Sequence, residues 1–238
     1  NYYPTIQQEM QMVVILSKNH TITMRELEDK KWFPEVFRRH QMDFLSMLAT
    51  RFQLYQPITD DLNALIEKDT SNQGTDVCSG SGGPLLSLRL KPNILLTDLY
   101  PPKEKIKLPD HITYYPQPID ITKDLPPGDG LITMFNSIHH FNQEEQENIL
   151  KKIGISERPF LAAEILQPKL LTLVKVILTT TIGHWILVPL MRPFSFTRIF
   201  FTYLIPIHTF TILVDGIISV FTSKNKKYYM IRFYSVFI

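Results

Sequence analysis

Apolar residues recur at helical spacing in the first part of the chain. Within residues 1–68, a short apolar stretch at 10–16 precedes a series with three- and four-residue spacing that lies on one helix face: Phe37, Phe44, Leu45, Leu48 and Phe52. Leu62, Leu65 and Ile66 indicate a further short helix. We predict a helical amino-terminal cap, whose aromatic residues either pack against the next domain or form a lid over a ligand site.

Residues 69–168 alternate short apolar runs with helical or turn segments, which predicts an α/β domain with a parallel sheet. Most of the expected strands end in polar or acidic residues, and the carboxyl ends of parallel strands are where ligands bind. A helix is expected from Asn142 to about Gly154. The expected strands are Asp76–Ser79, Ile94–Asp98, Ile112–Tyr115 with Pro118–Asp120, Gly130–Phe135 and Phe160–Ile165.

Residues 169–222 form two long apolar runs, Leu170–Met191 and Ile199–Thr222. Each is long enough to cross a bilayer, which takes about 20 residues. Asp215 would cost ~2.5–3.5 kcal/mol near the bilayer centre, and prolines interrupt both runs. We expect a helical hairpin that packs on the domain, dips into one leaflet or, least favoured, spans the membrane. The tail, 223–238, is strand-like and is a candidate edge strand.

A glycine-rich stretch from Asp76 to Pro84 is the strongest local signal for a ligand site. Glycines at 80, 82 and 83 permit close approach of a ligand, and Pro84 suits the first turn of a helix. The N–H groups at such a helix start favour a nucleotide-like or anionic ligand. Asp98 ends the next apolar run about 20 residues later, where a carboxylate can hold a ribose. A glycine loop alone is weak evidence, because about one such match in three is an ordinary turn, and Asp98 disfavours that alternative.

Composition narrows the possible partners. The 238 residues carry a net charge of +2, which gives no field that favours nucleic acid. Cys78 is the only cysteine, so an intrachain disulfide is excluded and a reducing, cytoplasmic location is expected. The amino end has no signal-peptide pattern and no initial Met, so we expect a fragment. No metal is predicted, because the cysteine and histidines lack zinc-ligand spacing and His139–His140 alone is not a site.

These motifs together resemble the class I S-adenosylmethionine-dependent methyltransferases, and more narrowly an uncharacterised bacterial branch with an apolar carboxy-terminal hairpin. The resemblance covers about residues 30–222. The matching pieces are Asp76-x-Cys78-x-Gly80-x-Gly82, Asp98 in Leu96–Pro101, Pro118-Ile119-Asp120, Met134–Phe141, and Phe201–Pro206 followed by Asp215-Gly216.

The resemblance implies a Rossmann-like fold, S-adenosylmethionine as cofactor and a role for each matching residue. Asp98 would accept hydrogen bonds from both ribose hydroxyls. Asp76 would bind the amino group of the methionine part, directly or through water. Asn136 would lie near the sulfonium. The remaining cofactor residues are Cys78, Gly80 and Gly82 along the methionine part, Asp120 at the adenine amino group, and Ile121 on the adenine ring.

Two features depart from the family pattern. Cys78 stands at the first glycine position and adds a side chain there. The chain also ends soon after the hairpin, where the fold normally has a last antiparallel strand pair. If the tail does not replace that pair, one sheet edge is exposed, and the protein is expected to be a truncated or inactive relative.

His139 and His140 are the candidate catalytic bases, since histidine titrates near neutrality; the alternative is that they only order their loop. A dinucleotide dehydrogenase is disfavoured, because Leu85 stands at the sixth position of its glycine fingerprint. We therefore predict a methyltransferase with a small or lipid-like acceptor and possible peripheral membrane contact through 170–222. The alternative is a catalytically inactive, membrane-associated binding protein. The acceptor atom and the oligomeric state stay open.

Overall fold

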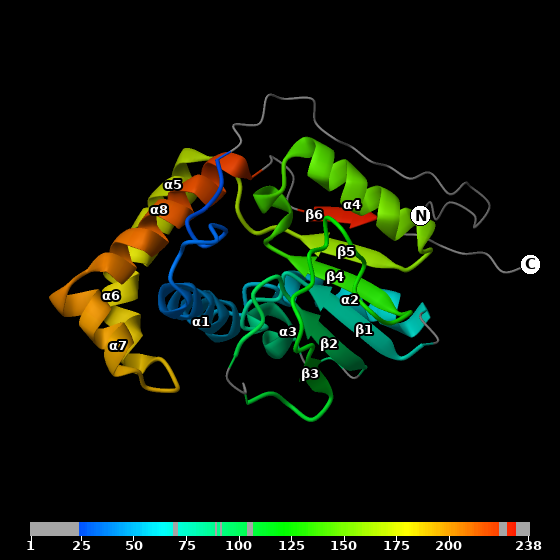
Figure 1. Ribbon diagram of the computed structural model, residues 1–238, viewed down its shortest axis with the longest axis horizontal. Helices are drawn as coiled ribbons and strands as arrows, with labels where there is room; N and C mark the ends of the chain where they lie inside the picture. Colours follow the sequence, from blue (N-terminus) through cyan, green and yellow to red (C-terminus); the bar gives the residue numbers. More distant parts are fainter. Residues whose placement is uncertain are drawn as a thin grey trace, which may run out of the picture.

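The computed structural model describes residues 24–68, 71–88, 90, 92–103, 107–223 and 228–231. The expected stretch at 10–16 and tail residues 232–238 lie outside this part. A six-stranded sheet with the order β3-β2-β1-β4-β5-β6 is at its centre (Figure 1). The strands are β1 (Gln73–Val77), β2 (Asn93–Thr97), β3 (Ile112–Tyr114), β4 (Leu131–Phe135), β5 (Phe160–Ala163) and β6 (Tyr228–Ile231).

The first five strands are parallel, as the alternating pattern predicted, and β6 pairs antiparallel with β5. The chain leaves β1 towards β2 on one side and returns to β4 on the other, so the order reverses between β1 and β4. This α/β arrangement is consistent with a Rossmann-like fold, in which ligands bind at such a reversal. β6, which belongs to the predicted strand-like tail, pairs with the edge of β5 that would otherwise be exposed.

The predicted strand positions need two corrections. β1 begins at Gln73 and ends at Val77, about three residues earlier than the apolar pattern indicated. The segment 118–120 is not a strand, although the Ile119 N–H donates to the Asp98 carbonyl at 2.9 Å. Pro116 and Pro118 have no N–H to donate to a ladder, which prevents regular pairing there.

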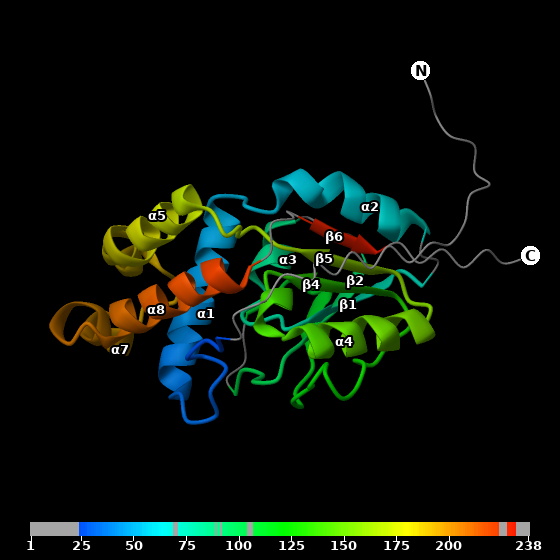
Figure 2. The same cartoon turned by 90° about the horizontal axis from the view of Figure 1, so that it is seen from above.

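Helices cover both faces of the sheet (Figure 2). On one face lie α2 (Thr59–Lys68) and α3 (Gly83–Ser87), which share an apolar core with alternate strand residues such as Leu96 and Leu131. On the other lies α4 (Gln143–Ile155), whose Ile149 and Ile153 contact Ile132 and Phe160. Asn142 and Glu145 form a capping box at the start of α4, because each side chain accepts the other's backbone N–H.

The other helices lie beyond the carboxyl ends of the strands (Figure 1). α1 packs against α3 and α8, and α5 packs against α8. A third apolar cluster, which includes Phe44, Val188 and Ile212, joins α1 to α8 and the segment after α6. The elements are α1 (Glu35–Arg51), α5 (Leu170–Leu178), the π-turn Thr179–Gly183, α6 (His184–Leu187), α7 (Phe196–Ile199), the π-turn Phe200–Leu204 and α8 (Ile207–Thr222); short 3₁₀ turns are Gln56–Ile58, Ile138–His140 and Val188–Leu190.

Two helical stretches are apolar enough to be considered as membrane segments. Leu170–Leu190 is continuous, long and apolar enough to cross a bilayer. Phe196–Leu204 and Ile207–Thr222 together pass the same criterion but are bent by 81°. Length and composition alone make these two segments candidates.

Candidate functional site

The loop after β1 turns sharply because three of its residues have left-handed backbone conformations. Cys78, Gly80 and Gly82 have φ values of +56°, +51° and +73°. Glycine adopts these values without strain, whereas Cys78 carries a Cβ in a conformation that L-residues disfavour by about 1–2 kcal/mol. Ser79 ties the loop to β2: its N–H donates to the Thr97 carbonyl, and its Oγ accepts from the Thr97 N–H.

Asp98 lies directly against this loop. One carboxylate oxygen accepts the Gly80 N–H at 2.9 Å, and the other accepts the Tyr100 N–H at 2.8 Å. Burial raises the pKa of this carboxyl above its usual value, while the two N–H donors act in the opposite direction. Each oxygen retains a lone pair for a further donor. Asp98 and the glycine loop thus form one polar feature at the reversal between β1 and β4.

Helix α1 covers the outer side of the glycine loop. A Cβ on Gly80 would lie 2.6 Å from Met42 Sδ, and one on Gly83 would lie 2.4 Å from Ser46 Cα. Ser81 Oγ also donates to Asp43 on α1 at 3.0 Å. The glycines therefore allow the close approach of a helix, a use that the sequence motif did not indicate.

Asp76 lies within β1 and not in the loop. It is buried, and Thr133 Oγ1 on β4 donates to its Oδ1 at 2.6 Å. Burial raises the pKa of Asp76 to about 7, despite the hydrogen bond from Thr133. Asp76 thus faces the neighbouring strand and retains its proton to a higher pH than an exposed aspartate does.

The residues expected at the adenine lie after β3. Asp120 accepts from the N–H and Oγ1 of Thr122 and forms a 3.0 Å ion pair with Lys123. Burial acts to raise the pKa of Asp120, but these partners lower it overall. Ile121 is buried in the core cluster under α4.

Asn136 follows β4 and has a left-handed φ of +49°. Its Oδ1 is buried and has no hydrogen-bond partner among the described residues. Ser137 Oγ lies 3.5 Å from the Cys78 carbonyl oxygen, so this turn adjoins the glycine loop. Because a buried amide oxygen without a donor is unfavourable, a ligand donor would be stabilised here.

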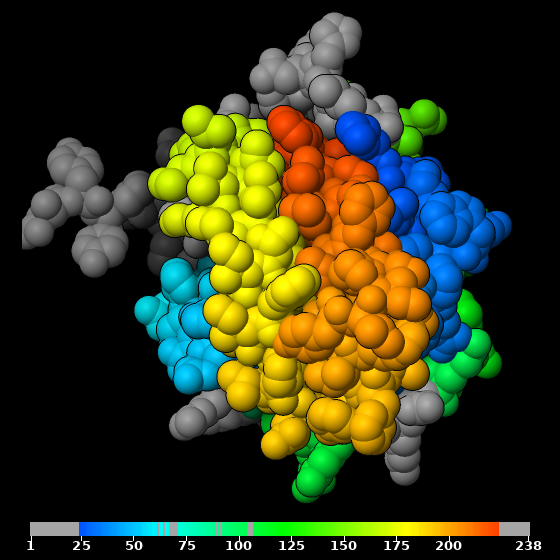
Figure 3. Space-filling model, turned by 90° about the vertical axis from the view of Figure 1, so that its left-hand side faces the viewer, coloured from blue at the N-terminus to red at the C-terminus, as the bar shows by residue number. Residues whose placement is uncertain are grey.

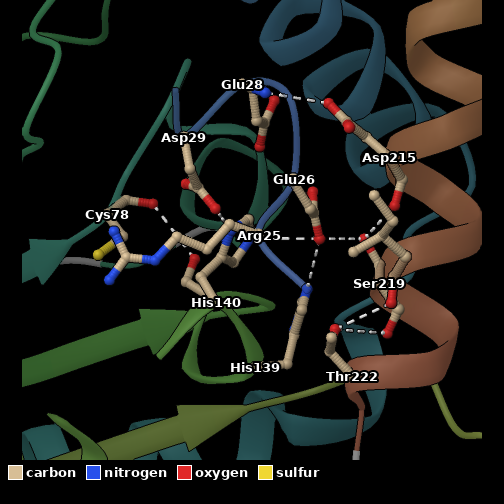
Figure 4. Close-up of polar contacts among 12 residues, drawn as sticks. Arg25, Glu26, Glu28, Asp29, Cys78, His139, His140, Asp215, Ser219 and Thr222 are labelled. Carbon is tan, nitrogen blue, oxygen red and sulfur yellow. Dashed lines mark hydrogen bonds and ion pairs between the residues drawn. The ribbon is translucent and has the colours of Figure 1, made fainter. Parts of the chain in front are cut away.

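The two histidines lie in a polar cluster, shown in Figure 4. His139 Nδ1 lies 2.6 Å from Glu164 Oε2, and His140 Nδ1 lies 3.0 Å from Asp29 Oδ2. Glu26 Oε1 lies near the Nε2 atoms of both rings and accepts a hydrogen bond from Ser219 Oγ on α8. The structure thus joins the turn after β4 to segment 24–34 and to α8.

The acids of this cluster set the charge of the histidines. Burial by itself lowers the pKa of His139, but Glu164 and Glu26 raise it to about 9. Burial likewise opposes charge on His140, whose pKa is nevertheless well above the usual value because Glu26 and Asp29 are close. Both rings are therefore positively charged at neutral pH, with a proton on each ring nitrogen. Either ring can act as a base only after it loses one of these protons.

Sequence reasoning missed most of this cluster. Glu164 lies within the expected strand 160–165, and Asp215 stands out in the sequence for its charge within an apolar run and for the Asp215-Gly216 match. Glu26 and Asp29 lie in a segment without helical or strand periodicity, more than 100 positions from the histidines. The pairing of charges between distant segments carries no local sequence signal.

A cavity of about 250 Å³ lies at the opposite, amino-terminal end of the strands. Gly74, Asn93, His111 and Gly128 are among its lining residues, and none of the predicted cofactor residues borders it. Parallel α/β sheets bind ligands at the other end.

No protein-family model matches the chain, and no curated protein is significantly similar to it. The residues and their geometry are therefore the basis for any functional proposal.

Proposed function

We propose that this protein is an S-adenosylmethionine-dependent methyltransferase whose cofactor binds at the reversal between β1 and β4. The observation that carries the proposal is the 2.9 Å hydrogen bond from the Gly80 N–H to the Asp98 carboxylate. It joins a sharp glycine turn to an acid at the end of the neighbouring strand, the pairing that adenosyl recognition needs.

The surrounding residues fit such a ligand. Asp98 has lone pairs for two ribose hydroxyls, and Asn136 Oδ1 is a buried acceptor without a donor. Met42 occupies the space beside Gly80, and its unbranched side chain can shift when a ligand enters. Asp76 accepts from Thr133 at Oδ1 and retains lone pairs for a further donor, so it can bind an amino group directly or through water.

The bound cofactor would supply the electrophilic methyl group, so the chain has to position the acceptor in line and exclude water. Segment 24–34 and α8 enclose the turn that carries His139 and His140. Both nitrogens of each ring face acids, Glu164 and Glu26 for His139 and Asp29 and Glu26 for His140, so base catalysis would require one ring to release its proton first.

The test is calorimetric titration of the purified full chain with S-adenosylhomocysteine, the demethylated cofactor. We expect saturable binding that Asp98→Ala weakens by roughly 10- to 100-fold, because hydrogen bonds to a charged group contribute about 1.5–3 kcal/mol each. Asp110→Ala is the matched control, since Asp110 borders the cavity at the other end of the sheet. Absence of binding, or equal binding by the Asp98 variant, would overturn the proposal.

A second candidate is a membrane-associated binding protein without transferase activity. The observation that favours a membrane role is the number of exposed apolar side chains on α5–α8, segments that together form one face of the molecule (Figure 3). Its exposed side chains include Leu170, Ile186, Phe196, Leu204 and Phe210, each more than 60% accessible. Cofactor binding separates the candidates, because only the transferase requires it; with binding present, the same face favours a lipid-like acceptor.

A further inference from the structure

Three side chains from two distant parts of the chain, Glu26 and the adjacent His139 and His140, direct ligand atoms at one point. His139 Nε2 lies 3.4 Å from Glu26 Oε1, and His140 Nε2 lies 3.9 Å from the same oxygen. All three ligand atoms fall within 4.8 Å of one another. Tetrahedral ligands with bonds of about 2.1 Å to zinc are about 3.4 Å apart, so small side-chain shifts would complete this geometry.

Both imidazole rings are held in the orientation that metal ligation requires. Glu164 holds Nδ1 of His139, and Asp29 holds Nδ1 of His140. The Nε2 atoms are thereby turned towards Glu26 (Figure 4). Histidine ligands in metalloproteins are oriented by a carboxylate or carbonyl on the other nitrogen in the same way.

His139 Nε2 makes no hydrogen bond among the described residues, although Glu26 Oε1 lies 3.4 Å away, within ion-pair distance. The His139 side chain is only 2% exposed. When this nitrogen loses its proton, its lone pair and the Glu26 carboxylate oxygen face the same point and can bind a cation together. This observation is independent of the clustering of acids.

The charge around the point is negative. Glu26, Asp29 and Glu164 surround the two imidazoles. Among the described residues, the ion pairs of Glu26, Asp29 and Glu164 involve only the two histidines. A divalent cation would balance this charge while neutral imidazoles act as its ligands.

We propose that Glu26, His139 and His140 bind one divalent transition-metal cation, with Zn²⁺ as the cation of choice. Histidine nitrogen and carboxylate oxygen are both zinc ligands, and three protein ligands leave a further position for water or a ligand. The cation would link segment 24–34 to the turn after β4. The proposal does not depend on cofactor binding, because neither Asp98 nor the glycine loop supplies a ligand.

The test uses the purified full chain after removal of bound metal with a chelator, without cofactor. Calorimetric titration with Zn²⁺ is expected to give one ion per chain, and Zn²⁺ is expected to raise the unfolding temperature. Co²⁺ in place of Zn²⁺ is expected to give the visible absorption of a four- or five-coordinate site. Glu26→Gln keeps the size of the side chain and is expected to weaken Zn²⁺ binding at least tenfold.

The orienting acids supply a second set of variants. Asp29→Asn and Glu164→Gln are expected to weaken Zn²⁺ binding by about 10- to 100-fold, since each removes the carboxylate that orients a ligand. Asp29 is partly exposed, so its variant serves if Glu26→Gln does not fold. The controls are Glu144→Gln and His111→Asn, which lie outside the cluster and are expected to bind as the unmodified chain does. Lack of saturable binding, or equal binding by the Glu26 and Asp29 variants, would refute the site.

Discussion

At the residue scale, Asp76 shows how burial changes the chemistry of one carboxyl. It is 2% exposed within β1, and its pKa is about 7 against 3.8 in an ordinary environment. The folded protein therefore holds a proton between about pH 4 and 7, where the unfolded chain has lost it. The proton held by Asp76 stabilises the fold at low pH, and this stabilisation is lost as the pH rises through about 7.

We predict that Asp76→Asn stabilises the protein at neutral pH, because the amide keeps the size of the acid and cannot ionise. The gain is expected to be on the order of 2–4 kcal/mol near pH 7 and to disappear near pH 4. Urea unfolding at a series of pH values measures it. The exposed Asp110→Asn is the control, and an identical pH profile for Asp76→Asn and the unmodified chain would contradict the prediction.

At the element scale, the contact between α1 and the glycine loop depends on one missing side chain. A Cβ on Gly83 would lie 2.4 Å from Ser46 Cα, a backbone atom that cannot move alone. We predict that Gly83→Ala forces α1 away and destabilises the fold by about 1–3 kcal/mol. Thermal and urea unfolding measure this loss.

Gly183 is the matched control for that substitution. It has helical backbone angles, and the nearest atom to an added Cβ is the Leu178 carbonyl oxygen at an ordinary 3.5 Å. Gly183→Ala is expected to be neutral or stabilising by up to ~1 kcal/mol. Equal losses for the two variants would show that steric contact with α1 is not the cause.

Also at the element scale, a cluster of histidines lies between α1 and the later helices. His184 Nε2 lies 3.2 Å from His208 Nδ1, and the His40 ring lies 5.2 Å from that of His208. Burial, with the charge of Arg198 close by, lowers the pKa of His40 and His184 to about 4 and that of His208 to about 2. The folded protein therefore keeps these rings neutral where the unfolded chain would take up protons.

We predict that acid weakens the packing of α1 against the later helices. The free energy of unfolding falls as the pH drops from about 6.5 towards 4, which is the reverse of the Asp76 effect. The Asp76→Asn variant removes one opposing contribution, while those of Glu28, Asp98 and Asp215 are the same in all variants compared. In that background His208→Gln is expected to flatten the acid side of the urea-unfolding profile, whereas His111→Gln leaves it unchanged. A profile that His208→Gln does not alter would rule out the cluster as its origin.

The elements differ in how well the sequence predicts them. β2, β4 and β5 are apolar runs bounded by polar residues, and they lie within one or two residues of the predicted ends. β1 starts early because Gly74 and Thr75 are buried without being apolar; Arg158 donates to Thr75 Oγ1 at 3.0 Å, a partner 83 positions away. Apolar periodicity cannot indicate a strand that is stabilised by such contacts.

The same distinction holds for the candidate site. Asp98 was predictable because a strand end and a glycine loop are local features that the parallel order brings together. Glu26 and Asp29 were not, because only the folded chain places segment 24–34 against the turn after β4. Cys78 was expected to disturb the loop, and the structure places it in the left-handed conformation that its position requires.

At the scale of the whole molecule, α8 has two sides with different partners. Asp215 accepts hydrogen bonds from the N–H groups of Leu27 and Glu28 and from Gln41 Nε2, at 2.6, 3.1 and 2.9 Å. Asp215, whose charge disfavours membrane insertion, thus has its hydrogen-bond partners inside the protein. The other side of the layer presents exposed apolar residues, and its exposed charges Lys169, Lys175 and Arg192 are all basic.

This distribution favours contact with one anionic leaflet, with the basic side chains near the headgroups. We predict that the full chain floats with vesicles that contain anionic lipid, and less so at high salt. The double substitution Ile186→Glu with Leu204→Glu is expected to reduce binding at least tenfold for each residue, because burial of such a side chain contributes about 1.5–3 kcal/mol. Ile155→Glu is the control: Ile155 is 74% exposed at the end of α4, away from this face. If the control reduces flotation as much as the double variant, or if the unmodified chain stays with the unbound fraction, this face does not contact lipid.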